Sequence, residues 1–295
     1  MRETLTEGKV VAAHAEAGPV ASAALNQHYA YRDVWQNDPK TCEQMLKLGV
    51  RRFETDLLPS SEGVPMVVHN SIIDGKNAWE WTTAELEARG CTPFDKQLDL
   101  VEKTLEGLPG EPTLFVETKG PGSESSEFTT DAGANGVSEQ GVILIKGVEE
   151  IIQKRVQSGK WRYDQLPLIS FNHKMLALTS KDICIGLSFA KENFDLQEEE
   201  MAHAIERPDF QTAFVDRMVQ EAVDAEAFAI NPDSRLVDER LVQAAEEKNI
   251  AVQAWMNFGV EEPLEDLLRW GVNVFTDCPL TAEAAKQKRL SPPTP

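Results

Sequence analysis

Short runs of apolar, β-prone residues recur along the whole chain, and more polar segments separate them. Several of the runs are apolar at consecutive positions, as is typical of strands that are buried on both faces of a parallel sheet. Eight such strands are predicted, at residues 9–13, 51–57, 113–118, 167–171, 183–187, 227–230, 250–255 and 273–277.

Segments with helical periodicity lie between most of the predicted strands. Their apolar residues are three and four positions apart, which places them on one face of a helix. The clearest are residues 41–49, 142–157, 210–223, 238–249 and 262–271. Alternating strands and helices indicate a parallel sheet, and eight units indicate a (β/α)8 TIM barrel, an α/β fold that forms a single domain over residues 1–295. An open Rossmann-like sheet is the alternative, but no GxGxxG motif follows an early strand.

Two segments depart from this alternation. Residues 64–68, VPMVV, predict a ninth strand in a hairpin-like excursion after the second strand, with residues 61–63 as its turn. Residues 120–141 are rich in Gly, Ser, Glu and Thr, and they predict a small insertion after the third strand that forms a mobile loop. A passive insertion is the ordinary interpretation of this loop, and a lid over the active face is the alternative.

The chain is strongly acidic. Its 295 residues include 29 Lys and Arg against 49 Asp and Glu, a formal net charge of −20. Such a field repels nucleic acids and anionic membranes, so an anionic substrate would need a local metal or cation. No apolar run of about 18 residues is present, and the four cysteines form no CxxC pair. These features predict a cytoplasmic protein with reduced thiols, no nucleic-acid partner and no stable membrane insertion.

Three acidic residues stand near the ends of predicted strands. Glu54 and Asp56 share one face of an extended strand, because side chains alternate along it. Glu117 lies near the end of the third strand, and Lys119 follows it. The carboxyl ends of barrel strands carry the chemistry, and adjacent strands bring these carboxylates together. Such oxygen ligands suit one divalent cation, Mg²⁺, Ca²⁺ or Mn²⁺, better than zinc.

A histidine accompanies the acids in the sequence. His69 follows VPMVV, where a buried strand would emerge at the surface. Taken one at a time, the acids are ordinary solvated or salt-bridged carboxylates, but their repetition together with an imidazole indicates metal-assisted proton-transfer chemistry. His173 and His203 carry weaker signals and are interpreted as surface or capping residues.

An ordered series of motifs resembles the glycerophosphodiester phosphodiesterase family, which belongs to the phospholipase-C-like barrel superfamily together with sphingomyelinase D enzymes. The motifs are LGVRRFETD followed by VPMVVHN, then VETK, LISFN, IAVQAWMNF and LLRWGVNVFTDCP, so the resemblance covers most of the chain. It implies roles for seven residues at matching positions. These are metal binding by Glu54, Asp56 and Glu117, acid and base catalysis by His14 and His69, phosphate contact by Lys119, and a pocket wall beside the substrate from Trp255.

The first predicted strand departs from the family pattern. The family usually has His-Arg-Gly there, whereas this chain has His14 followed by Ala15 and Glu16. His28, with Arg32 nearby, is the alternative first histidine. His14 is favoured because VVAA before it is a credible strand. The loss of the arginine puts the affinity for phosphate in question.

The resemblance implies a metal-dependent phosphodiesterase that hydrolyses a small-molecule or lipid-derived phosphodiester to an alcohol and a phosphomonoester. A phospholipase D-like activity on lysophospholipids or sphingolipids is one alternative, and Trp79 and Trp81 are its only apolar hint. A catalytically impaired barrel that binds a phosphorylated ligand is the other. The motifs do not distinguish attack by water from formation of a cyclic phosphate.

Overall fold

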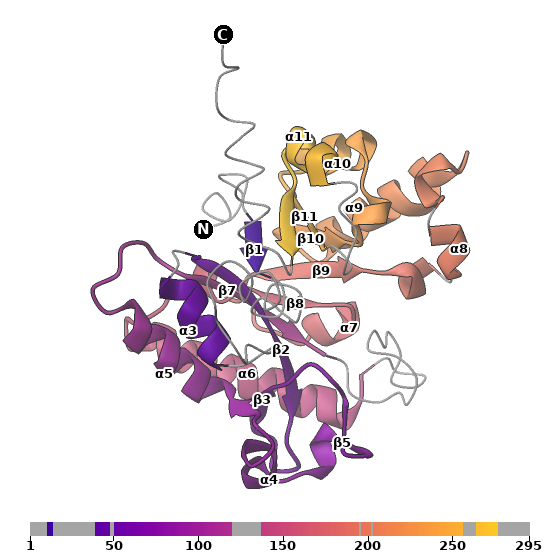
Figure 1. Ribbon diagram of the computed structural model, residues 1–295. Coiled ribbons are helices and arrows are strands. Elements are labelled where there is room, and N and C mark those ends of the chain that lie inside the picture. Colours follow the sequence, from indigo (N-terminus) through magenta and orange to yellow (C-terminus); the bar gives the residue numbers. More distant parts are fainter. Residues whose placement is uncertain are drawn as a thin grey trace, which may run out of the picture.

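Parallel strands close into a barrel at the centre of the molecule (Figure 1). The structure is a computed structural model that describes residues 11–13, 39–47, 50–119, 137–194, 196–201, 203–255 and 264–276. Within these residues the barrel strands are β1 (Val11–Ala13), β2 (Arg52–Pro59), β7 (Thr113–Thr118), β8 (Leu168–Ser170), β9 (Ile185–Phe189), β10 (Ala229–Pro232), β11 (Ala251–Trp255) and β12 (Asn273–Thr276). They coincide with the eight strands predicted from the sequence, to within a few residues at each end.

These strands are arranged around the barrel in the order in which they occur in the chain, and the last strand pairs with the first. Each strand from β7 to β12 pairs in parallel with the next, β2 pairs with β7, and β12 pairs with β1. A further parallel pairing, with Ala13 opposite Phe53, joins β1 to β2 and closes the ring. The predicted TIM barrel is therefore confirmed.

Helices cover the outside of the barrel, as Figure 1 shows. The longer ones are α3 (Pro39–Lys47), α5 (Phe94–Leu105), α6 (Glu139–Gln157), α9 (Asp216–Asp224) with the π-helical turn η6 (Gln211–Val215) before it, α10 (Glu239–Glu246) and α11 (Leu264–Trp270). The shorter ones are α4 (Thr83–Glu87), α7 (His173–Leu176), α8 (Glu198–Met201), η2 (Ala78–Glu80), η3 (Tyr163–Gln165), η4 (Lys191–Phe194), η5 (Ala204–Glu206) and η7 (Ser234–Leu236). The segment predicted as a mobile loop ends sooner than expected, because the Ser138 side chain caps α6 by accepting the Gly141 N–H at 3.0 Å. Residues 120–136 lie outside the described part of the chain.

The excursion predicted after the second strand is present. β3 (Pro65–Val67) runs antiparallel to β2, and β6 (Thr92–Pro93) runs antiparallel to β3. The short hairpin β4 (Ile72–Ile73) and β5 (Lys76–Asn77) lies between them in sequence. This excursion extends the sheet beyond the barrel and carries the chain through His69.

Side chains that alternate along each strand belong to two separate hydrophobic cores. On β7, Leu114 and Val116 belong to the larger core between the strands and the helices, whereas Phe115 belongs to a smaller core inside the barrel. Phe275 on β12 also lies in the inner core and meets Phe115 edge to face, with 5.0 Å between ring centroids. Residues on the inner parity of each strand therefore point into the barrel, and a polar residue there faces an enclosed space.

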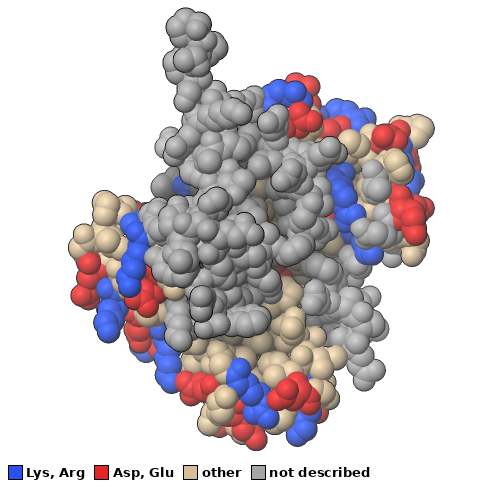
Figure 2. Space-filling view, in the orientation of Figure 1, with Lys and Arg blue, Asp and Glu red and all other residues tan. Residues whose placement is uncertain are grey.

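Charges of both signs are mixed on the surface. Figure 2 shows blue and red side chains interspersed among the described residues on the face in view, at both ends of the molecule. No helix in the described ranges is both long and apolar enough to cross a membrane.

Candidate active site

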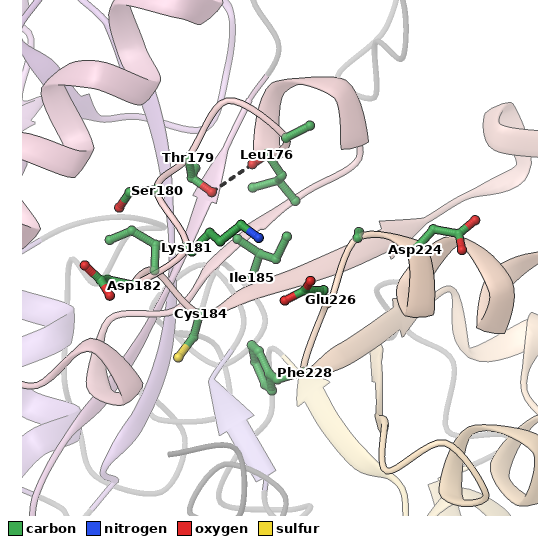
Figure 3. A pocket seen from close by; sticks show the side chains of 13 residues that line it. Leu176, Thr179, Ser180, Lys181, Asp182, Cys184, Ile185, Asp224, Glu226 and Phe228 are labelled. Carbon is green, nitrogen blue, oxygen red and sulfur yellow. Dashed lines mark hydrogen bonds between the residues drawn. The ribbon is translucent and has the colours of Figure 1, made fainter.

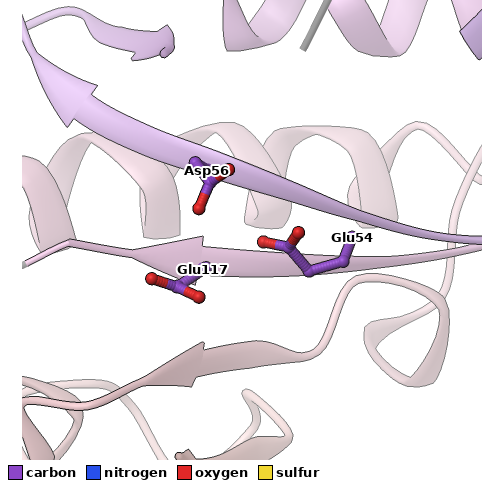
Figure 4. A group of neighbouring side chains, drawn as sticks. All are labelled: Glu54, Asp56 and Glu117. Carbon is purple, nitrogen blue, oxygen red and sulfur yellow. The ribbon is translucent and has the colours of Figure 1, made fainter. Parts of the chain in front are cut away.

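The predicted acid cluster is formed by two adjacent barrel strands. Glu54 and Asp56 lie on the inner face of β2, and β7 brings Glu117 into register with Asp56 (Figure 4). One carboxylate oxygen from each residue lies within 4.8 Å of the others. The exposed fractions are 1% for Glu54, 0% for Asp56 and 6% for Glu117. The sequence prediction that these three acids converge is therefore correct.

A lysine neutralises part of this cluster. The ammonium of Lys119 lies 2.9 Å from Asp56 Oδ1 and 2.8 Å from Glu117 Oε1, and its side chain is 6% exposed. Its position follows from the strand, since Lys119 is two residues beyond Glu117 and its N–H donates to the Leu57 carbonyl of β2 at 3.1 Å. Burial alone lowers the pKa of Lys119, but the charges of Asp56 and Glu117 outweigh it and raise that pKa above its ordinary value. Lys119 is thus held as a cation.

The donor set of the cluster suits a hard divalent cation. Three buried carboxylates converge, and oxygen atoms no more than 4.8 Å apart can be bridged by one ion at ordinary metal–oxygen distances of about 2.0–2.6 Å. Thiols and imidazoles take no part in this group among the described residues. Mg²⁺, Ca²⁺ and Mn²⁺ are the ions that such ligands favour.

His69 lies two residues beyond the end of β3, and the backbone just before it stays close to β2. The Val68 N–H donates to the Asp56 carbonyl at 3.0 Å, so the chain enters His69 from the strand that bears the acids. The ring is half-buried, and its Nδ1 lies 2.9 Å from Asn70 Oδ1. A proton on Nδ1 donated to that oxygen makes Nε2 the basic nitrogen of the neutral ring. Asn70 can therefore orient this imidazole.

Aromatic side chains near the ends of β8 and β11 belong to the inner core. Trp255 ends β11, is 9% exposed, and donates its Nε1–H to the Phe189 carbonyl at 3.3 Å. Phe171, just beyond β8, meets Trp255 edge to face at 5.7 Å. The hydrogen bond and the ring contact hold the Trp255 indole within the inner core.

A charged pair that sequence reasoning missed lies beside Trp255. Asp233 follows β10, forms an isolated parallel bridge with Trp255, and is 1% exposed. Its carboxylate accepts from Arg235 Nε at 3.0 Å and from Arg235 Nη2 at 2.8 Å. The signal was available in the sequence, since NPDSR places polar residues directly after the predicted strand at 227–230.

Other sequence candidates do not form part of this cluster or fall outside the described chain. Trp81 is 9% exposed, and Lys76 and Arg89 cover its ring at 4.5 Å and 3.7 Å from the centroid. Because its own chain supplies these cations, Trp81 is a packed residue and not an open wall for a choline-like group. His14 and His28 lie outside the described residues, although the strand that leads to His14 pairs with β2.

A hollow of about 430 Å³ lies elsewhere on the barrel. It is formed by the segments that precede β9 and β10, so it lies at the amino-terminal ends of these strands, away from the acids. Lys181 and Glu226 reach toward its interior in Figure 3. The acid cluster, on the inner face of β2 and near the carboxyl end of β7, is the candidate active site of the fold.

Comparisons with solved structures identify proteins that share this fold. No protein-family model matches the sequence, and a search of curated proteins finds no match. A glycerophosphodiester phosphodiesterase from Parabacteroides distasonis superposes with a TM-score of 0.64 at 14% identity, covering 96% of this chain and 99% of that one. One from Thermotoga maritima gives 0.59 at 17% identity, covering 93% and 98%. A phosphodiesterase from Oleispira antarctica, solved with the product sn-glycerol-3-phosphate, gives 0.62 at 14% identity, covering 94% and 96%. The chain has the fold of these enzymes over nearly its whole length.

Proposed function

We propose that this chain is a metal-dependent phosphodiesterase of the glycerophosphodiester type. The observation that carries the proposal is the convergence of Glu54, Asp56 and Glu117, with Lys119 beside them, at the carboxyl end of a barrel shared with such enzymes. Buried acids cost free energy unless a cation accompanies them, so a cluster of three is retained where a cation is used.

Glu54, Asp56 and Glu117 would hold the metal. When bound, a divalent cation supplies positive charge that stabilises the negative oxygens of a phosphodiester in the transition state. This local positive charge would also attract an anionic substrate, which the net charge of −20 otherwise repels.

Two proton transfers are needed to break a phosphodiester. One group removes the proton from the attacking oxygen and another protonates the leaving oxygen. We assign these roles to His69 and His14. His69 is supported by the backbone bond that ties Val68 to Asp56 and by the orienting contact with Asn70. His14 is supported by β1, since Ala13 pairs with Phe53, the residue before Glu54.

The substrate would lie between the acids and the aromatic wall. Lys119 would contact a phosphate oxygen, and Trp255 with Phe171 would border the organic part. The neighbour from Oleispira antarctica binds sn-glycerol-3-phosphate, which supports a small-molecule or lipid-derived phosphodiester as the substrate class. The acidic surface favours such a substrate over nucleic acid, and we infer that the protein works in the cytoplasm.

The experiment is hydrolysis of glycerophosphocholine and of bis(p-nitrophenyl) phosphate by chelator-treated protein, with Mg²⁺, Ca²⁺ or Mn²⁺ added back. Turnover that appears only with added metal is expected. Turnover that is equal with and without metal would contradict the metal site. Metal binding without turnover of either compound would contradict the proposed activity and favour a barrel that binds a phosphorylated ligand.

A further inference from the structure

The ammonium of Lys119 contacts two of the three carboxylates that are candidates for metal ligands. It touches Asp56 Oδ1 and Glu117 Oε1 at 2.9 Å and 2.8 Å, in a pocket where the three side chains concerned are at most 8% exposed. An ion pair at such distances, shielded from water, is far stronger than one at the surface. Lys119 therefore interacts directly with the candidate metal ligands, in addition to its proposed contact with phosphate.

Charge shows why the lysine is needed there. Glu54, Asp56 and Glu117 would place three negative charges within 4.8 Å of one another in a region that is largely shielded from water. Like charges so close and so buried repel strongly. Lys119 offsets one of these charges, and it is the cation that the described structure pairs with both Asp56 and Glu117.

A divalent cation that binds the same carboxylates would lie close to the Lys119 ammonium. The cation and the Lys119 ammonium would each be within bonding distance of Asp56 and Glu117, and two positive charges at that separation repel. Lysine has a flexible stem of four carbons, so its ammonium can swing while its backbone N–H stays bonded to the Leu57 carbonyl of β2. The acids have shorter side chains than lysine, and their backbones are fixed by the pairing of β2 with β7.

We propose that Lys119 is a resident counter-ion that a divalent metal displaces from Asp56 and Glu117, and that this displacement presents the ammonium to the phosphate of the substrate. Metal binding and phosphate binding are then coupled through one side chain. The inference rests on the metal site of the proposed function, and it adds that each of the two ligands strengthens the binding of the other.

The first test measures metal affinity without any substrate. Mg²⁺, Ca²⁺ and Mn²⁺ are titrated calorimetrically into chelator-treated wild-type protein, Lys119→Met and Lys160→Met. Lys160 is the matched control, since it also pairs with an acid, Glu102 at 2.6 Å, but its side chain is 53% exposed. Removing the competing charge should tighten metal binding by Lys119→Met at least about tenfold, whereas Lys160→Met should bind like the wild type. Unchanged or weaker binding by Lys119→Met would overturn the proposal.

The second test measures coupling to phosphate. In wild-type protein, saturating Mg²⁺ should strengthen binding of sn-glycerol-3-phosphate, and in Lys119→Met the gain should be about tenfold smaller. An equal gain in both proteins would show that Lys119 is not presented to phosphate. If the wild type binds no metal at all, the proposed metal site falls as well, and this outcome is distinct from normal metal binding with no effect of Lys119.

A measurement on wild-type protein covers the case in which Lys119→Met fails to fold. A buried, ion-paired ammonium exchanges its protons slowly, so its nitrogen and hydrogen signals can be followed by nuclear magnetic resonance. A protected lysine ammonium signal is expected in metal-free protein, and Mg²⁺ should shift it or remove it in proportion to site occupancy. A signal that persists unchanged at metal saturation would refute the exchange.

Discussion

At the scale of single residues, Asp56 is central to the candidate site. Its side chain contacts Lys119, its backbone carbonyl accepts the Val68 N–H, and it stands in register with Glu117. One residue thus links the acid cluster, the cation and the segment that carries His69.

Asp56→Asn and Glu117→Gln should each reduce metal-dependent turnover by about a hundredfold or more, because each removes a charged ligand while keeping the side-chain shape. Initial rates on a phosphodiester, with metal affinity measured in parallel, check this. Asp164→Asn is the matched control, since Asp164 is also buried, at 6% exposed, but pairs with Arg162 elsewhere. Normal rates in both Asp56→Asn and Glu117→Gln would contradict the proposed site.

His14→Ala should lose turnover by about a hundredfold or more, whereas His28→Ala should retain it, since acid or base catalysis typically contributes about that factor. His69→Ala should resemble His14→Ala. Rates of all three variants, with far-ultraviolet circular dichroism to verify folding, decide the assignment. Loss of activity in His28→Ala with normal activity in His14→Ala would move the first catalytic histidine to position 28.

At the scale of elements, charged contacts tie helices to one another and to the barrel. Arg155 of α6 is 6% exposed and binds three acids of α5, with Nε 2.8 Å from Asp95, and Nη1 2.7 Å from Asp99 and 2.8 Å from Glu102. Removing the acids would leave the buried Arg155 charge unpaired, and removing Arg155 would leave the acids without their cation. Either change lowers the free energy of unfolding. The α5–α6 contact is therefore sensitive to this one arginine.

Arg155→Met should lower the free energy of unfolding by about 1–3 kcal/mol, because it removes several charged hydrogen bonds but leaves acids that are partly exposed to solvent. Turnover per folded molecule should change little. Arg162→Met serves as the control and should lose about 1 kcal/mol or less, because the Arg162 side chain is 49% exposed. Urea denaturation measures both. Equal, small losses would mean that the Arg155 cluster contributes little.

His173 joins three elements. Its Nδ1 lies 2.9 Å from Glu221 Oε2 of α9, and its Nε2 lies 2.8 Å from the Ser188 carbonyl of β9. The bond from His173 lowers the pKa of Glu221 below its ordinary value, against the opposing effect of burial. A lowered carboxyl pKa stabilises the fold above the ordinary pKa, and this contribution is lost as pH falls through the lowered value.

His173→Gln should therefore be less stable than the wild type at neutral pH, and the difference should shrink on acidification toward about pH 4 and below, as Glu221 takes up its proton. Urea midpoints as a function of pH test this. In a Glu221→Gln background, the stability difference caused by His173→Gln should no longer depend on pH. A gap between wild type and His173→Gln that stays constant over this range would show that Glu221 is not the group involved.

The strands were the most predictable elements, and cross-strand contacts were the least. Thr113–Thr118 was predicted to the residue, because a buried parallel strand is a continuous apolar run with clear ends. The two-residue strands of the excursion carry no such signal. The helix Phe94–Leu105 was not among those singled out, although its apolar positions repeat at helical spacing. The contact between Lys119 and Asp56, by contrast, depends on strand pairing, and no local pattern reveals it.

At the scale of the whole molecule, the site joins residues that are distant in sequence into one rigid frame. A metal that binds only the folded arrangement of Glu54, Asp56 and Glu117 must stabilise the entire barrel, since these acids cannot converge in an unfolded chain. Metal affinity and global stability are therefore linked.

Metal at about 100 times its dissociation constant should raise the free energy of unfolding by about 2.7 kcal/mol. Thermal unfolding of chelator-treated protein with increasing Mg²⁺, Ca²⁺ or Mn²⁺ measures this as a rise in Tm. Glu54→Gln should show little rise, which separates binding at the acids from a general effect of salt. A rise of equal size in Glu54→Gln would place the metal elsewhere.

The strand β1 has only three residues in the described chain, and it closes the ring by pairing with β12 on one side and with β2 on the other. Val11 lies opposite Val274, so this closure joins the two ends of the chain and is the contact that requires the longest loop to form. The acids on β2 and β7 are neighbours across one crossover and can meet earlier. β1 can also pair early with β2, since Ala13 and Phe53 are close in sequence, so the contact between β1 and β12 is the one expected to form last and to lock the acids into the finished barrel.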